Sequence, residues 1–262
     1  MQVLKLPSAN TAASAAADLV VDALGRIAAP VLGLPTGRTA VALYRALVAR
    51  HRAGQADFAR TVTFNLDEFA GLPAEHPGSY HTFMHEHLFQ HVNLAPDRTH
   101  LLRGSARDWR AEMARYERRL ADLGGLDLAI VGIGMNGHIA FNEPAPALIA
   151  RTHRVRLAPS TRRANASGFG HRWQDVPTHA LSMGIGTIFS ARRIILLATG
   201  AHKASIIGRA LTGPVTTRVP ASLVQVHPDV VVVLDRAAAA RLPRQLPVAR
   251  RPRPDAGTPA SD

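Results

Sequence analysis

A glycine-rich stretch near the middle of the chain contains a histidine and a glutamate whose spacing suits acid–base chemistry. His138 ends the run Gly-Ile-Gly-Met-Asn-Gly-His, and Glu143 follows it closely. Imidazole titrates near neutral pH, and a neighbouring carboxylate orients the ring and stabilises its protonated form. The chain has 13 histidines, so it is the glycine-rich loop and the nearby glutamate that single out this one. We predict that His138 and Glu143 form an acid–base pair.

Two consecutive carboxylates form a second candidate site. Asp67 and Glu68 directly follow the β-rich run Thr-Val-Thr-Phe-Asn-Leu at 61–66. A carboxylate at the end of a buried strand can have a raised pKa and then serves as a base. The alternative is that these residues cap a helix or form a surface pair. Their spacing leaves both interpretations open.

A third group of residues suits a phosphate. In the loop Gly-Leu-Pro-Thr-Gly-Arg-Thr, Gly37 and Thr39 lead into a helical pattern. Backbone N–H groups and the positive end of a helix dipole are then available to an anion. Lys203, near another helix start, could add a point charge, and Arg162 a bidentate fork. Taken singly, the loop is equally consistent with a structural turn, and each basic residue with a solvated surface charge.

The sequence does not fit the signatures of several common cofactor, metal and nucleophile sites. Residues 132–137 read GxGxxG, but Pro144 and Pro146 oppose the helix that a dinucleotide fingerprint should open. The segment Arg151–Arg156 also stands where an acidic residue would be required. The chain has no HExxH, GxSxG or nucleotide P-loop motif and no cysteine. We therefore expect no metal and no cofactor.

Apolar runs that alternate with helical patterns must position these groups. The runs predict strands at 29–34, 61–66, 126–131, 193–199 and 230–234, and helical spacing predicts helices at 11–24, 41–51, 109–123 and from about 203. Strands that are apolar on both faces are typical of a parallel sheet covered on both sides. We predict a three-layer α/β fold with a mostly parallel, Rossmann-like, open doubly wound sheet. Ligands bind beyond the carboxyl ends of such strands, so the polar groups that follow them should meet in one crevice.

The composition is that of an ordered protein, with 47% hydrophobic and 19% charged residues. The formal net charge of +12 favours anionic ligands, but scattered basic residues and 5% aromatics predict no specific nucleic-acid partner. Without a membrane-length apolar run or a secretory h-region, we expect a cytoplasmic protein with no membrane partner. We predict one domain over residues 1–240 and a disordered Pro/Arg-rich tail over 241–262.

Six segments together resemble the glucosamine-6-phosphate deaminase (glucosamine-6-phosphate isomerase) family. They are GLPTGRT (33–39), TFNLDEFAGLPAEHPGSYHTFMHEHLF (63–89), VGIGMNGHIAFNEPA (131–145), STRRAN (160–165), PTHALSMGIGTI (177–188) and TGAHKA (199–204). The resemblance covers roughly residues 31–235. It implies conversion of glucosamine 6-phosphate and water into fructose 6-phosphate and ammonia, without a cofactor. The expected partner is therefore a small phosphorylated amino sugar, and a homo-oligomer is compatible with the sequence.

The resemblance also implies a role for each matching residue. Asp67 would move a proton between C2 and C1 of the sugar through an enolamine. His138, supported by Glu143, would open the pyranose ring. The phosphate would be held by the side chains of Thr39, Arg162 and Lys203 and by the loop backbone at Gly37 and Arg38.

Two departures from the pattern of some relatives lie within the candidate site. Asn136 stands where they have an aspartate two residues before the histidine. An amide can orient an imidazole but cannot stabilise imidazolium by charge, so we expect His138 to rely on Glu143 alone. Arg38 stands where some relatives have glycine. It either points outward or adds charge to the phosphate site.

Two other functions are compatible with parts of the pattern. A 6-phosphogluconolactonase-like hydrolase would use the same phosphate site and a histidine that activates water, but it would not need the carboxylates at 67 and 68. A non-catalytic sugar-phosphate sensor would carry a helix-turn-helix before the sheet, whereas only about 28 residues precede the first predicted strand. The presence of Asp67, His138 and Glu143 together favours an enzyme.

Overall fold

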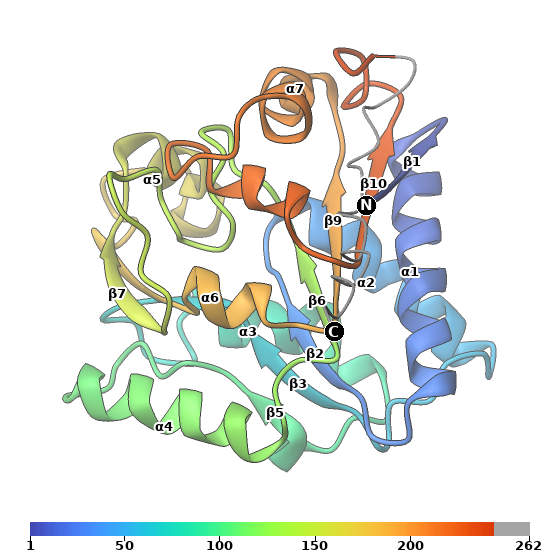
Figure 1. Ribbon diagram of the computed structural model, residues 1–262. Helices are drawn as coiled ribbons and strands as arrows, with labels where there is room; N and C mark the ends of the chain where they lie inside the picture. The colour runs from blue at the N-terminus through green and yellow to red at the C-terminus, as the bar shows by residue number, and fades with distance from the viewer. Residues whose placement is uncertain (244–262) are drawn as a thin grey trace, which may run out of the picture.

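A parallel sheet forms the centre of the molecule. The computed structural model describes residues 1–243, and within them seven strands pair in the order β1-β10-β9-β6-β2-β3-β5 (Figure 1). These strands are β1 (Gln2–Leu6), β2 (Val31–Leu34), β3 (Val62–Asn65), β5 (Thr99–His100), β6 (Leu128–Val131), β9 (Arg193–Ala198) and β10 (Val230–Asp235). The order reverses between β2 and β6, because the chain first adds β3 and β5 on one side of β2 and then crosses to β6 on the other. Such a reversal opens a crevice at the carboxyl ends of the two strands.

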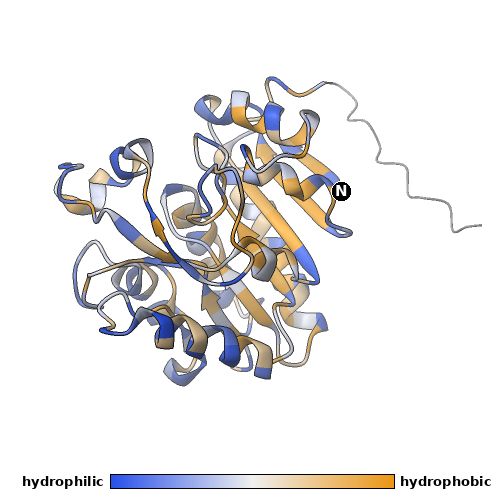
Figure 2. Cartoon of the chain, turned by 60° about the vertical axis from the view of Figure 1, so that its left-hand side comes forward, coloured by the Kyte–Doolittle hydropathy of each residue, from blue (hydrophilic) through white to orange (hydrophobic). Residues whose placement is uncertain are grey.

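Helices cover both faces of this sheet. They are α1 (Ala9–Arg26), α2 (Arg38–Arg52), α3 (Tyr80–His87), α4 (Trp109–Asp122), α5 (Pro159–Ala164), α6 (Ile185–Phe189) and α7 (Ala204–Thr212), with the 3-10 helices η1 (Phe89–His91), η2 (Pro96–Arg98), η3 (Ala166–Phe169), η4 (Ala201–Lys203) and η5 (Pro220–Gln225). Side chains of α1, α2 and α3 pack in the hydrophobic core on one face, and those of α4, α6 and α7 in the core on the other. Along β10, Val231 and Val233 join the first core, whereas Val230 and Val232 join the second. The strands are therefore apolar on both faces, and Figure 2 shows them running through the interior.

The first helix illustrates how local sequence builds this packing. Ser8 and Thr11 form a capping box, in which the Ser8 hydroxyl accepts from the Thr11 amide at 3.2 Å and the Thr11 hydroxyl accepts from the Ser8 amide at 2.9 Å. The buried side of α1 carries Ala12, Ala16 and Ala17, all completely buried. These small side chains allow the helix backbone to lie close to the sheet.

A second, smaller sheet lies beside the main one. It contains β4 (Asp67–Phe69), β8 (His179–Ser182) and β7 (His153–Arg156), paired antiparallel in the order β4-β8-β7. In Figure 1, β7 and α5 lie on the opposite side of the molecule from α1. A separate apolar cluster belongs to this region and contains Phe69, Tyr80, Phe141, Leu157, Phe169, Val176 and Ala180. This sheet was not predicted, because its short strands carry charged and polar residues that do not form an apolar run.

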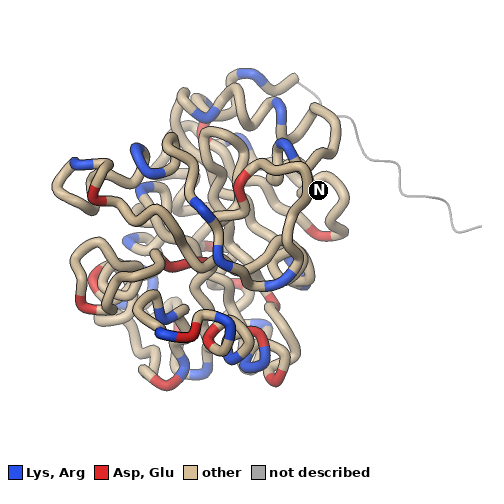
Figure 3. The backbone as a smooth tube through the Cα atoms, turned by 90° about the vertical axis from the view of Figure 1, so that its left-hand side faces the viewer, with Lys and Arg blue, Asp and Glu red and all other residues tan. Residues whose placement is uncertain are grey.

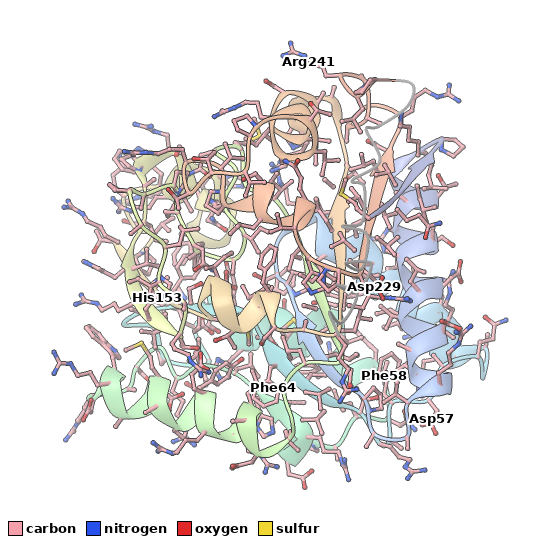
Figure 4. All side chains as sticks on the ribbon, in the orientation of Figure 1. Asp57, Phe58, Phe64, His153, Asp229 and Arg241 are labelled. Atoms are coloured by element: carbon pink, nitrogen blue, oxygen red, sulfur yellow. The ribbon has the colours of Figure 1, made fainter. Side chains whose placement is uncertain are left out.

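The predicted three-layer fold is confirmed, and so are the predicted strands of the main sheet. The short edge strands β1 and β5 were not predicted. Figure 4 labels Asp229, just before β10, and Arg241, beyond the end of that strand. Of the predicted tail, residues 244–262 lie outside the described residues. None of the helices in the described part of the chain is long and apolar enough to cross a membrane. Lys and Arg are distributed over many elements and interspersed with Asp and Glu (Figure 3).

Candidate active site

Four neighbouring strands bring the predicted polar groups to one edge of the sheet. The order β9-β6-β2-β3 is contiguous and parallel. The loop with Lys203 follows β9, the loop with His138 follows β6, the loop with Gly37 follows β2, and Asp67 follows β3. The convergence expected from the strand pattern is therefore present in the fold.

The loop after β6 is shaped by glycines that hold His138 in place. The amide of Gly134 donates to the carbonyl of His138 at 2.9 Å, and the Asn136 side-chain oxygen accepts from the His138 amide at 3.2 Å. Gly137 has φ +92°, a conformation that favours glycine. The imidazole lies directly against Gly134, where an added Cβ would be 2.3 Å from the ring. No dinucleotide-type helix follows, since the next regular element is the strand β7.

Glu143 is the centre of a hydrogen-bonded cluster. Its Oε2 atom lies 3.5 Å from Nδ1 of His138 and accepts from the Asn136 amide group at 2.5 Å. Its Oε1 atom accepts from the Thr161 hydroxyl at 2.6 Å and from the Ala158 amide at 3.3 Å. Burial raises the pKa of Glu143, but His138 and the hydrogen-bond donors outweigh it and lower the pKa to about 2. The carboxylate is therefore ionised at neutral pH and can orient and charge-stabilise the imidazole.

Asp67 is a buried carboxylate whose charge acts on three buried tyrosine side chains. It is 5% exposed. Burial, and then the charge of Glu68, raise its pKa well above the usual range. Its charge in turn helps to raise the pKa values of three buried phenols, which come from three helices: Tyr44 on α2, Tyr80 on α3 and Tyr116 on α4. A carboxylate in such a place is an unusually strong base once it is ionised.

The strand pairing ties Asp67 to the His138 loop. Asp67 is the register partner of Ser182 in β8. The Ser182 hydroxyl accepts from the amide of Phe141, three residues beyond His138, at 3.1 Å. The Asn142 side chain also donates to the carbonyl of Met183 at 2.9 Å. One short stretch of β8 therefore fixes both chemical groups, although the sequence offered no signal that this serine would do so.

Glu68 behaves differently from its neighbour. It is 1% exposed, and it accepts hydrogen bonds from the backbone amides of Tyr80 and His81 at the start of α3. Of the two interpretations that the sequence left open for this pair, helix capping applies to Glu68. Asp67 does not share that capping role.

The loop after β2 leads straight into α2. Gly37 has φ +93° and is the N-cap residue, and its carbonyl accepts from the Ala40 amide at 3.0 Å. Arg38 and Thr39 form the first turn of the helix, and Arg38 is exposed. The unpaired amides of this turn and the helix dipole form an electropositive end.

Lys203 links the loop after β9 to the loop after β6. Its ammonium group donates to the carbonyl of Ile133 at 2.6 Å. Burial, and then the charge of Arg38, lower the pKa of Lys203 to about 8. Lys203 and Arg38 are therefore near enough to repel each other. An anion bound between these two groups would relieve the repulsion.

Arg162 has partners that the sequence could not predict. Its guanidinium donates to the carbonyls of Val176 and Gln174 at 2.9 and 2.8 Å and lies over the ring of Trp173 at 5.1 Å. It also lines a depression of about 520 Å³, whose other residues include Asn136 and Glu143. The structure thus groups Arg162 with the Glu143 cluster, and it groups Lys203 with Arg38.

Comparisons with known proteins place the chain in a family. Residues 7–233 match the family described as glucosamine-6-phosphate isomerases/6-phosphogluconolactonase. The glucosamine-6-phosphate deaminase of Halothermothrix orenii is 49% identical over 212 residues, which cover 81% of this chain and 88% of that protein. The glucosamine-6-phosphate deaminase 2 of Bacillus subtilis is 49% identical over 213 residues, or 81% of this chain and 86% of the relative.

Solved structures show the same relationship. A structure described as a monomeric glucosamine-6-phosphate deaminase is 41% identical and superposes with a TM-score of 0.89, covering 92% of this chain and all of that one. The 6-phosphogluconolactonase of Trypanosoma brucei is 17% identical with a TM-score of 0.70, covering 92% of this chain and 98% of that one, a likeness of fold alone. The chain belongs to the family of glucosamine-6-phosphate isomerases and 6-phosphogluconolactonases.

Proposed function

We propose that this protein converts glucosamine 6-phosphate and water into fructose 6-phosphate and ammonia. The observation that carries the proposal is the pairing of a buried, unusually basic Asp67 with the His138–Glu143 pair through β8 and the loop that follows β6. An aldose–ketose isomerisation needs one strong base near the reacting carbons and one acid–base group at the ring oxygen. The similarity to several glucosamine-6-phosphate deaminases supports the amino sugar as substrate.

Binding begins with the phosphate. The first-turn amides of α2 and the hydroxyl of Thr39 would donate hydrogen bonds to the phosphate oxygens, with Lys203 as the counter-charge. Arg38 adds positive charge beside Lys203. Arg162 remains a predicted phosphate ligand through the guanidinium N–H groups that the carbonyls of 174 and 176 leave unused. Holding this remote group places the reacting carbons in register with the catalytic residues.

Ring opening is assigned to His138. The imidazole takes the proton of the C1 hydroxyl and delivers one to the ring oxygen as the C1–O5 bond breaks, which produces the open-chain aldehyde. Ionised Glu143 stabilises the transient imidazolium and fixes the ring orientation, and Asn136 holds Glu143. This pair therefore needs a carboxylate that stays charged. The low pKa of Glu143 provides one.

Isomerisation and deamination are assigned to Asp67. Its carboxylate removes the proton from C2, which gives an enolamine, and then returns a proton to C1, which gives a ketimine. Water adds to C2 of the ketimine and ammonia leaves, so the net reaction is hydrolytic. Because the charged sugar phosphate does not cross membranes, we place the reaction in the cytoplasm, where sugars are phosphorylated.

Ammonia release from glucosamine 6-phosphate by the purified protein tests this proposal, with hydrolysis of 6-phosphogluconolactone as the comparison. Turnover of the amino sugar without turnover of the lactone is the expected result. Lactone hydrolysis without ammonia would instead support the lactonase alternative. That alternative has no use for a strongly basic Asp67, and its solved structures share only the fold with this chain.

A further inference from the structure

Glu68, the most deeply buried carboxylate of the described residues, has no part in the proposed reaction. Glu68 follows Asp67 directly and is 1% exposed. Its Oε1 atom accepts from the Phe69 amide at 2.8 Å and the Tyr80 amide at 3.0 Å. Its Oε2 atom accepts from the amides of Tyr80 and His81 at 2.9 and 3.1 Å and lies 2.9 Å from Nδ1 of His81. Every direction in which this carboxylate accepts hydrogen bonds is thus occupied.

These contacts join two elements that are separated in the chain. β4 ends at Phe69 and α3 begins at Tyr80, so Glu68 bridges the intervening residues 70–79. The capped turn of α3 presents Tyr80, one of the phenols whose pKa the charge of Asp67 raises. Tyr80 also stacks on Phe141 of the His138 loop, at 6.0 Å between ring centroids. The position of Glu68 therefore affects both sides of the catalytic centre.

The adjacent carboxylates divide the available donors unequally. Neighbouring residues of a strand point to opposite faces, so Asp67 and Glu68 do not compete for the same side. Glu68 receives the donors of α3, whereas the pKa of Asp67 reflects burial and the charge of Glu68 alone. A carboxylate without donors is the more basic one of such a pair.

We propose that Glu68, together with His81, is a positioning residue for the isomerisation step: it anchors α3 to β4, and it sets a fixed negative charge beside Asp67. The inference rests on the function proposed above. Glu68 itself does not touch the substrate. His81 is the partly exposed end of the pair, with 26% of its side chain accessible.

The charged and phenolic groups around Asp67 determine how removal of the Glu68 charge should change the pH dependence of the reaction. They are Glu68 on β4, Tyr44 on α2, Tyr80 on α3 and Tyr116 on α4. Beyond burial, it is the charge of Glu68 that raises the pKa of Asp67. Its removal should make Asp67 easier to ionise and less basic, so the acidic limb of the kcat/KM profile should move to lower pH.

The variant Glu68→Gln tests this, because it preserves shape but removes the charge. We expect kcat to fall at least tenfold with KM for glucosamine 6-phosphate changed less than threefold, and the acidic limb to shift down by about one pH unit. Glu112→Gln is the matched control, since Glu112 is also buried and accepts from a backbone amide and Arg115. It should lower stability without moving the acidic limb. An unmoved limb and an unchanged kcat in folded Glu68→Gln would overturn the proposal.

Two further variants serve if Glu68→Gln does not fold. His81→Leu removes the side-chain donor to Glu68, whereas His81→Asn offers an amide N–H in a similar position. We expect a several-fold loss of kcat in the first and recovery in the second, and equal rates in both would contradict the proposal. Hydrogen exchange of the Tyr80 and His81 amides is independent of turnover. It should accelerate in His81→Leu even if the wild-type protein released no ammonia, so failure of the positioning role and failure of the proposed reaction are distinguishable.

Discussion

The contact between Gly134 and His138 allows a sharp test of the ring-opening role. A Cβ at position 134 would lie 2.3 Å from two atoms of the imidazole and 2.5 Å from a third, whereas ordinary contacts begin at 3.4 Å. In Gly134→Ala the ring must therefore retreat by about 1 Å or rotate away. Gly134 does not have a positive φ, so alanine fits the backbone conformation. The strain should fall on the catalytic side chain and leave the fold largely intact.

The expected effect is large on activity and small on stability. A misplacement of about 1 Å in a catalytic group costs on the order of a hundredfold in rate, or about 2.7 kcal/mol of transition-state stabilisation. We expect kcat for ammonia release to fall by about that factor in Gly134→Ala. The free energy of urea unfolding should change by less than about 1 kcal/mol, because a partly exposed ring can move with little loss of packing.

Gly132→Ala is a matched control in the same loop. An added Cβ there meets nothing within 4 Å, and the residue has no positive φ. The control should retain wild-type kcat within about twofold. Equal activity of both variants would refute the reasoning, since the imidazole would then not need its position against Gly134. An open-chain substrate analogue adds a second check, because it bypasses ring opening and should be much less sensitive to Gly134→Ala.

Three other predictions follow from the charged groups. Asp67→Asn should lower kcat by about a thousandfold while leaving KM nearly unchanged, and appreciable ammonia release by this variant would count against the base assignment. Because burial raises the folded-state pKa of Asp67, the stability of the wild-type protein should fall as pH rises through that pKa. Urea unfolding should find this dependence absent from the variant. The pKa of Glu143 is lowered to about 2, so its contribution to the free energy of unfolding is present above about pH 4.5 and lost as pH falls toward 2. Glu143→Gln should therefore lower the free energy of unfolding by about 2 kcal/mol at pH 6 and by less at pH 3. A loss that does not shrink at the lower pH would be inconsistent with an ionised carboxylate. With a pKa of about 8, Lys203 loses its charge in mildly alkaline solution, so KM for glucosamine 6-phosphate should rise above pH 8 in steady-state assays. Lys203→Ala should raise KM at pH 7 about tenfold or more, and Lys203→Arg should flatten the pH dependence of KM. An unaltered KM in the alanine variant would exclude the phosphate role.

The main sheet was predictable because its physics is local and repetitive. Strands such as β9 and β10 are buried on both faces, so each one reads as a continuous apolar run. The parallel arrangement then places the loops after successive strands at one edge, which is why the sequence alone could predict a candidate site there. The sheet of β4, β8 and β7 was missed, because strands of three or four residues with charged side chains carry too little periodicity to register.

Individual contacts in the site were harder to predict than its location. Arg162 was expected to bind phosphate, but its nearest acceptors are backbone carbonyls at 174 and 176, and every residue has such a carbonyl. Ser182 likewise gives no chemical signal in the sequence. Its importance comes from its register opposite Asp67 and its bond to the Phe141 amide. Contacts of this kind depend on the tertiary arrangement, which residue type and spacing do not encode.

The two carboxylates of the proposed mechanism show how environment divides roles between chemically similar groups. Glu143 is partly buried but receives donors from Asn136, Thr161 and the backbone, and it lies beside His138, so its pKa falls to about 2. Asp67 is buried, its carboxylate accepts no hydrogen bond from any of the described residues 1–243, and it lies beside the charge of Glu68, so its pKa rises. A carboxylate with a very low pKa is a poor base but a dependable counter-ion for an imidazolium, and one with a raised pKa is a good proton acceptor. Exchanging the two environments would exchange the proposed roles. In the proposed reaction, the hydrogen-bond donors around each carboxylate therefore decide, more than the carboxylates themselves, which residue moves the proton between C2 and C1.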